Sequence, residues 1–122
     1  MPERANGRAA SFEITVETPD ASSTLLRLAF GEPASNDVMV RDVDRRMKEL
    51  KGRELTGGRL VLLNGAASLP VIAVIIHHVA HLFGAVAIYD PKLQRYVIVA
   101  SHGSELEVGE ILSVRNAGQF GR

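Results

Sequence analysis

The sequence contains no cysteine and no tryptophan, and aromatic residues make up 5% of its 122 positions. Without cysteine there are no disulfides and no thiolate chemistry, so a reducing compartment, the cytoplasm, is expected. With so few aromatic rings, base stacking is not expected to dominate any recognition of nucleotides. No apolar run approaches the length that spans a membrane, and the first residues lack the apolar segment of a signal peptide. We therefore expect a cytoplasmic protein with no membrane partner.

Neither sign of charge is in excess, because 14 basic residues balance 14 acidic ones. Proteins that bind DNA non-specifically usually carry a basic surplus, so DNA is not an expected partner. The balance is compatible with a small phosphate-bearing ligand held by backbone N–H groups. The length suits one domain, which we expect over residues 11–116, after a disordered segment at 1–10 and before a frayed tail at 117–122.

The first half of the chain predicts two strands and a helix. Residues 11–17 and 23–30 alternate between apolar and polar side chains, which is typical of half-buried strands, and residues 18–20 suit a turn between them. A helix is expected from residue 35 or 36 to about residue 51, with Asp42 on its charged, solvent-facing side. The residues with helical spacing on the other side are Val40, Val43, Met47 and Leu50.

Two apolar runs predict a sheet that is covered on both faces. Residues 60–63 and 85–89 are almost continuously apolar, as is typical of buried strands in a parallel or mixed sheet. Further strands are expected at residues 95–100, returning antiparallel, and at residues 111–114, at the edge of the sheet. These patterns predict an α/β fold with a single domain.

A helix is expected between the two apolar strands. Ser68 is a good N-cap, and Pro70 fits the first helical turn, where a missing N–H costs nothing. Residues 71–76 are apolar all round, which predicts a largely buried helix ending near Gly84. Their β-branched side chains are also compatible with a strand, so both interpretations stay open.

The turn before this helix is a candidate phosphate-binding loop. It consists of Asn64, Gly65, Ala66, Ala67 and Ser68. Free backbone N–H groups and the positive end of the helix dipole favour an anion there. The loop has neither a Walker nor a dinucleotide-binding motif, so an ordinary strand–helix turn explains the same residues.

Three histidines crowd the end of the predicted helix. His77 and His81 are four residues apart, so they share a helix face and can bind one metal ion or one phosphate. His78 points elsewhere, and we interpret it as a solvated residue at a helix end whose dipole favours cations. His81 lies at the turn into a buried strand, which favours a functional role.

Further polar residues lie at the predicted strand ends. Asp90 follows the strand at 85–89, a common functional position in open α/β sheets, although an aspartate before proline also opens turns. His102 follows the next strand, next to Ser101 and near Glu105. Together with His81 these residues suit general acid–base chemistry or a hard divalent ion.

The second half of the chain carries the residues Ala80-His81, Tyr89-Asp90-Pro91, the basic Lys92, Ser101-His102 and Ser104-Glu105-Leu106, in this order. They resemble those of one protein family, the small CRISPR-associated ring nucleases of type III systems, once described as manganese-dependent deadenylating exoribonucleases. The resemblance implies a Rossmann-like fold with a mixed sheet and two main helices. It also implies dimers that stack head to tail, as a tetramer or filament, around cyclic tetra-adenylate and cleave it to linear products.

The resemblance also assigns roles to residues of this chain. It implies that activity depends on His81 and Asp90, with His102 as a further shared histidine, and that the cofactor is a divalent metal ion, Mn²⁺. Our own candidates for its ligands are His81 and His102. Lys92 stands where the family is expected to have arginine, and lysine cannot make a bidentate phosphate contact. The loop before the helix also differs from the family's glycine–proline turn with a basic residue.

These features lead to one function and two alternatives. The first is a ring nuclease that destroys a cyclic oligoadenylate messenger and switches off an antiviral response. The alternatives are a module that sequesters the messenger without cutting it, and a Mn²⁺-dependent 3′-exoribonuclease acting on short A-rich RNA. The strand–helix–strand pattern puts Asp90, Lys92 and the loop at residues 64–68 on one edge of the sheet, and His81 and His102 on the opposite edge. We therefore predict a composite active site formed between stacked dimers.

Overall fold

The structure is a computed structural model that describes residues 10–115 and 119–121. Its elements, in chain order, are β1 (Phe12–Asp20), β2 (Ser23–Phe30), α1 (Asn36–Leu50), β3 (Gly58–Gly65), α2 (Leu69–Val79), β4 (Phe83–Asp90), β5 (Arg95–Ser101), β6 (Ile111–Arg115) and β7 (Gln119–Gly121). The strands form one mixed sheet in which spatial order follows chain order, β1 to β7. The predicted α/β fold with a mixed sheet and two main helices is confirmed.

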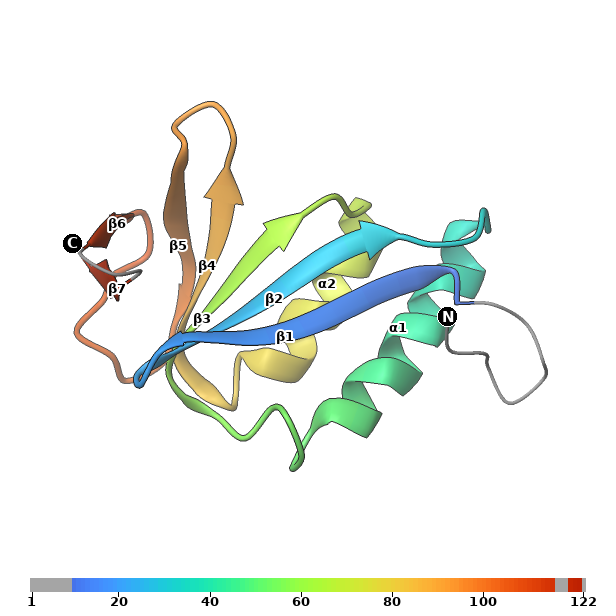
Figure 1. Ribbon diagram of the computed structural model, residues 1–122, viewed down its shortest axis with the longest axis horizontal. Helices are drawn as coiled ribbons and strands as arrows, with labels where there is room; N and C mark the ends of the chain where they lie inside the picture. The colour runs from blue at the N-terminus through green and yellow to red at the C-terminus, as the bar shows by residue number, and fades with distance from the viewer. Residues whose placement is uncertain (1–9, 116–118, 122) are drawn as a thin grey trace.

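The centre of the sheet is parallel and its flanks are antiparallel. Strand β2 pairs with β3, and β3 with β4, in parallel, while β1, β5 and β6 join as antiparallel neighbours. Parallel neighbours need a crossover, which α1 provides between β2 and β3 and α2 provides between β3 and β4. Because both crossovers advance in the same direction, both helices lie on one face of the sheet (Figure 1).

The main core fills the space between the two helices and the sheet. Fully buried side chains from α1, α2 and the central strands meet there, among them Met47, Ile75, Leu26 and Leu63. The apolar residues that were predicted to recur at helical spacing lie on the face of α1 that packs against the sheet. Helix α2 is buried on one side only, through Val71, Ile75, His78 and Val79. The expectation that residues 71–76 are largely buried is therefore only partly met, since Val71 and Ile75 are buried but Ala73 is exposed.

A second, smaller core covers the opposite face of the sheet. Its members are Leu25, Leu60, Leu62, Ala85, Ala87, Tyr96, Ile98, Leu106 and Leu112. Leu106 comes from the loop between β5 and β6, so this loop folds back over the central strands. Two-sided burial explains why residues 60–63 read as a continuous apolar run.

Two predicted boundaries are wrong. Strand β1 continues to Asp20, where a turn at residues 18–20 was expected, and the turn instead falls at Ala21 and Ser22. Gly84 does not end the second helix: α2 ends at Val79, and Gly84 lies inside β4. Strand pairing overrides the glycine signal, because Phe83 already pairs with Gly58 of β3.

Asp42 is buried, contrary to its predicted place on the solvent-facing side of the helix. Its side chain is 1% exposed; it accepts a hydrogen bond from Ser11 Oγ at 2.6 Å and pairs with Arg45 Nη1 at 3.1 Å. A carboxylate is tolerated in such a place only when it is paired and hydrogen-bonded. The contact joins the start of the sheet to the first helix, a relation that helical periodicity cannot predict.

Ser68 caps α2 as expected and also ties the two helices together. Its Oγ accepts from the backbone N of Val71 at 3.4 Å and donates to Asn36 Oδ1 at 2.7 Å, at the start of α1.

Replacing Ser68 with alanine should lower the free energy of unfolding by about 1 kcal/mol through loss of the cap. Urea unfolding of both proteins measures this difference. An unchanged stability would show that the cap contributes nothing, and Ser22→Ala, in an exposed turn, is a suitable control.

The expectations for the chain ends concern mostly residues outside the described ranges. Of residues 1–10, the structure describes Ala10, which is buried and accepts a hydrogen bond from the backbone N of Glu32. Of the expected tail at 117–122, residues 119–121 form β7, which pairs antiparallel with β6. Residues 117, 118 and 122 lie outside the described part of the chain.

Candidate functional site

The predicted site residues lie at two opposite edges of the sheet, one at the carboxyl ends and the other at the amino ends of the parallel strands β3 and β4. Because β3 and β4 are parallel, Gly65 and Asp90 both end their strands at the same edge. His81 precedes β4, and His102 follows the antiparallel β5, so both histidines lie at the other edge. Strand β4 has eight residues, which puts the edges about 23 Å apart at about 3.3 Å per residue. The predicted separation of the two groups is therefore present in the fold.

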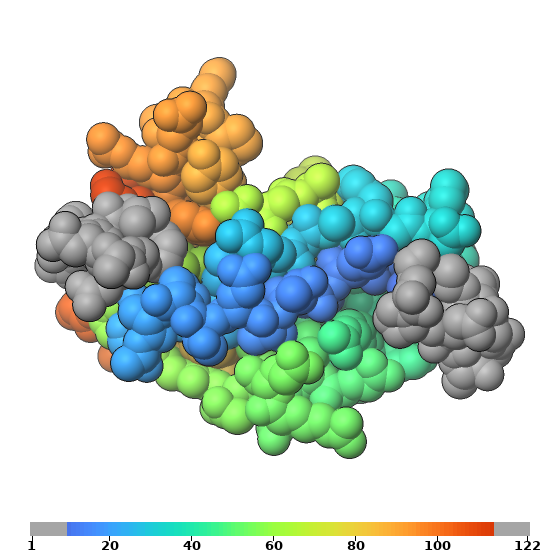
Figure 2. Space-filling view, viewed as in Figure 1, coloured from blue at the N-terminus to red at the C-terminus, as the bar shows by residue number. Residues whose placement is uncertain are grey.

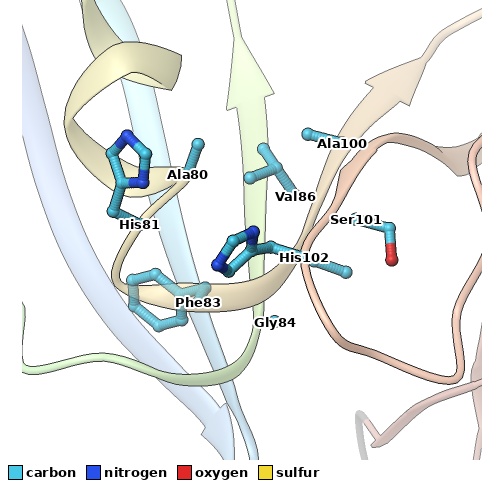
Figure 3. Close-up of a pocket in the computed structure, with 9 residues that line it drawn as sticks. Ala80, His81, Phe83, Gly84, Val86, Ala100, Ser101 and His102 are labelled. Carbon is cyan, nitrogen blue, oxygen red and sulfur yellow. The ribbon is translucent and has the colours of Figure 1, made fainter.

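His81 and His102 lie together beside a small pocket. The centroids of their rings are 6.2 Å apart and the ring planes are at 82°. The pocket has a volume of about 130 Å³, and its floor is apolar, with Phe83, Val86 and Ala100 (Figure 3). His81 reaches it from the turn after α2 and His102 from the end of β5. Both histidine side chains are exposed. Because its volume is only about 130 Å³, the pocket can accept a group of a few atoms but cannot enclose a nucleotide.

Hydrogen bonds hold the backbone around both histidines. The N–H of His102 donates to the carbonyl of Gly84 at 2.7 Å, and the N–H of Leu82 donates to the carbonyl of Val79 at 3.0 Å. Ser101 Oγ donates to the carbonyl of Leu106 at 2.6 Å, which fixes the loop that follows β5. The imidazoles are thus presented from constrained backbone, as acid–base catalysis requires. The sequence suggested a pair of His81 with His77 on one helix face and also put His81 and His102 at the same edge; the fold brings His81 next to His102.

The two histidines alone do not make a manganese site. Among the described residues, no three His, Cys, Asp or Glu side chains lie close enough together to hold a metal ion. Mn²⁺ prefers carboxylate, carbonyl and water oxygens, whereas His81 and His102 supply two imidazole nitrogens. Residues 10–115 and 119–121 of a single subunit therefore do not by themselves fit the ion that the family resemblance implies.

Asp90 and Lys92 lie on a hairpin that projects from the molecule. The turn between β4 and β5 is the upper projection in Figures 1 and 2. Asp90 Oδ1 accepts from the backbone N of Lys92 at 2.8 Å and from that of Leu93 at 3.3 Å. The turn-forming role of Asp90 is thus present, and it engages one of the two carboxylate oxygens. Lys92 is exposed, so its ammonium group is presented to solvent.

The loop at residues 64–68 offers fewer free donors than a phosphate-binding loop. Gly65 has φ +129°, and a Cβ there would lie 2.0 Å from the carbonyl oxygen of Leu28, so only glycine fits. The N–H of Ala66 already donates to that same carbonyl at 3.2 Å. Asn64 Nδ2 donates to Tyr96 Oη at 2.8 Å across the sheet. Contacts with β2 and β5 therefore use groups that were expected to face a ligand.

His78 is buried, so its predicted place at a solvated helix end is wrong. Its side chain is 5% exposed, and its Nε2 lies 2.6 Å from Asp44 Oδ1 of α1. Asp44 also pairs with Lys48 Nζ at 2.9 Å. The hydrogen bonds from Lys48 and then from His78 hold the pKa of Asp44 below the usual range of an aspartate. The packing of α1 beside α2 explains the burial, which no local pattern around His78 indicates.

The Asp44–His78 contact should make stability depend on pH in acid. Replacing Asp44 with alanine should lower the free energy of unfolding by about 1 kcal/mol at pH 7, because solvent screens the half-exposed carboxylate but His78 loses its partner. Because the folded state lowers the pKa, this contribution is complete above the unfolded pKa and is lost as pH falls through the folded one. The difference from the wild type should therefore shrink below about pH 4.

Urea unfolding at a series of pH values measures this difference. A matched control is Glu49→Ala, because Glu49 is an exposed acid of α1 whose ion pair with Arg46 is long, at 3.6 Å. A destabilisation by Asp44→Ala that stays constant from pH 7 to pH 3 would contradict the assignment.

The fold and the site define a small α/β protein with a two-histidine pocket at the amino ends of parallel strands. This position is unusual, since ligands of open α/β sheets bind at the carboxyl ends. A family model described as CRISPR-associated protein (Cas_csx3) matches residues 38–113, which is more than half of the chain, and the protein belongs to this family. No curated protein and no solved structure matches the chain. Within the described ranges, no helix is long and apolar enough to cross a membrane.

Proposed function

We propose that this protein is a ring nuclease that opens a cyclic oligoadenylate, with cyclic tetra-adenylate as its preferred substrate, and so ends antiviral signalling by type III CRISPR systems. The observation that carries the proposal is the pair of exposed histidines, 6.2 Å apart, beside a pocket too small for a whole nucleotide. Two imidazoles at this spacing can act on one phosphodiester, one as base and the other as acid. Membership of a CRISPR-associated family supports the biological setting.

The proton transfers of the proposed reaction use the two histidines. A neutral imidazole takes the proton of a ribose 2′-OH, and the 2′ oxygen forms a bond to the adjacent phosphorus. The bond from phosphorus to the 5′ oxygen breaks, and the second imidazole, initially protonated, gives its proton to that oxygen. The products are a 2′,3′-cyclic phosphate and a 5′-hydroxyl, with no net uptake of water or protons. Mn²⁺ stays a proposed cofactor, and no step above passes through it.

We further propose that the active site is shared between stacked dimers. The sheet separates His81 and His102 from Asp90 and Lys92 by about 23 Å, so one subunit cannot apply both groups to one phosphodiester. Head-to-tail stacking brings unlike edges together, because a heterologous contact pairs one surface with a different one. Lys92 then contributes positive charge to the ligand phosphates, and Asp90 orients the nucleophile, while the histidines of the next dimer move the protons.

Incubation with cyclic tri-, tetra- and hexa-adenylate, with and without Mn²⁺, followed by mass analysis tests the proposal. We expect linear products with 2′,3′-cyclic phosphate ends from cyclic tetra-adenylate. Intact ligand recovered after tight binding would instead indicate a sequestering module. Degradation of linear A-rich RNA at an equal or higher rate would indicate a 3′-exoribonuclease. Products that have gained the mass of one water molecule would replace attack by the 2′-OH with attack by water.

A further inference from the structure

The turn that carries His81 is attached to the end of a helix, and a polar contact between His78 and Asp44 joins that end to α1. Helix α2 ends at Val79, and the N–H of Ala80 still donates to the carbonyl of Ile76 at 2.9 Å. His81 follows directly, before β4 begins at Phe83. The direction in which the imidazole of His81 points is therefore set by the position of the last turn of α2.

Apolar packing holds this last turn against the core without a preferred direction of contact. Val79 is buried in the core, and apolar contacts are not directional. The contact between His78 Nε2 and Asp44 Oδ1, at 2.6 Å, is directional and joins α2 to α1. His78 lies three residues before His81, and only Val79 and Ala80 separate them along the chain. A displacement at His78 is thus transmitted to His81.

The surroundings of His78 exclude a direct part in chemistry. The imidazole is 5% exposed, and its Nδ1 is buried with no hydrogen-bond partner among the described residues. A proton on Nδ1 would be a buried donor without an acceptor, so the tautomer with the proton on Nε2 suits the site. Asp44 is held in place from its other oxygen by Lys48, which fixes the acceptor. His78 can orient its neighbours but cannot exchange protons with a substrate.

We infer that His78 and Asp44 are positioning residues that orient His81 toward His102 and the pocket beside them. The contact lies between two helices that meet again at their amino ends, where Ser68 donates to Asn36. Helix α2 is therefore tied to α1 near both ends, and it carries His81 at the end next to the Asp44 contact. The expected effect on kcat rests on the proposed function, whereas the expected effect on the orientation of His81 rests on the fold alone.

Substitution of His78 tests the inference through the separation of kcat from KM. His78→Leu keeps the buried volume but removes the donor, and we expect kcat for cyclic tetra-adenylate to fall about 10- to 100-fold, with KM within about twofold, since small misplacement of a catalytic group has this cost. His78→Gln can still donate to Asp44 from its side-chain amide and should recover most of kcat. Glu49→Ala, which alters an acid of α1 that pairs within its own helix, should leave kcat unchanged.

A second variant and a second measurement cover the other outcomes. If His78→Leu does not fold, Asp44→Ala, which removes the half-exposed acceptor, should show the same loss of kcat. The Hε1 resonances of His81 and His102, observed by NMR, should move in either folded variant and stay in Glu49→Ala. Wild-type kcat, or unmoved resonances of His81, in a folded His78→Leu or Asp44→Ala protein overturns the inference. If the wild type cleaves no cyclic oligoadenylate, the proposed function fails, and the resonances alone decide the positioning role.

Discussion

A mixture of two inactive variants, His81→Ala and Asp90→Asn, should cleave the cyclic tetra-adenylate that neither variant cleaves alone. Each protein keeps the edge that the other lacks, and a head-to-tail contact joins the histidine edge of one dimer to the Asp90 edge of the next. An equal mixture should reach about a quarter of the wild-type rate, because random stacking joins two intact edges at about one contact in four. Asparagine is chosen at position 90 because it also accepts the turn-forming hydrogen bonds that Asp90 Oδ1 receives.

The fold supplies a matched negative control for this mixture. His102 lies at the same edge as His81, so a mixture of His81→Ala with His102→Ala contains no intact histidine edge and should stay inactive. Turnover by the wild type should also rise more steeply than linearly with protein concentration. If the first mixture stays inactive while mixed assemblies form, or if an isolated monomer works at the full rate, the shared site is wrong.

His81→Ala should abolish cleavage and leave the fold intact. Loss of a general acid or base costs about 10²- to 10⁴-fold in rate. The side chain is exposed and contributes little packing, so the melting temperature should stay close to that of the wild type. The measurement combines a single-turnover cleavage assay with thermal unfolding of the same preparation.

His77→Ala is the matched control for this substitution. His77 is an exposed histidine near the end of α2, four residues before His81. Its ring lies against His78, with centroids 5.8 Å apart, and not beside His102. It should keep wild-type activity. A well-folded His81→Ala protein with full activity would remove His81 from the mechanism.

Much of the candidate site could be placed from the sequence because it depends on chain order. A parallel crossover returns each strand to the edge where the previous one began, so the strand–helix–strand pattern is enough to separate Asp90 from His81. That His81 and His102 share an edge could be predicted in the same way, but the closeness of their rings, 6.2 Å between centroids, could not. It depends on the register of β5 against β4, in which Ser101 pairs with Ala85, and on the backbone bond from His102 to Gly84.

The predicted ligand loop shows the same division. That Ser68 caps a helix could be predicted, because a cap involves residues three positions apart. That the loop packs against β2 could not, since the carbonyl of Leu28, which meets both Gly65 and Ala66, lies far away in the sequence. A long-range contact thus consumed a donor that the local pattern left open for a phosphate.

The sequence by itself determined the elements of this protein: the buried strands, the first helix with its apolar face, and the cap of the second. These depend on periodicity and on hydrogen bonds between near neighbours. Only the tertiary structure decided which polar side chains are buried. Asp42 and His78 are drawn into the interior by Ser11 and Asp44, partners 31 and 34 residues away. A local pattern specifies which face a side chain occupies, but the free energy of burying it depends on the partner that the fold brings to that face.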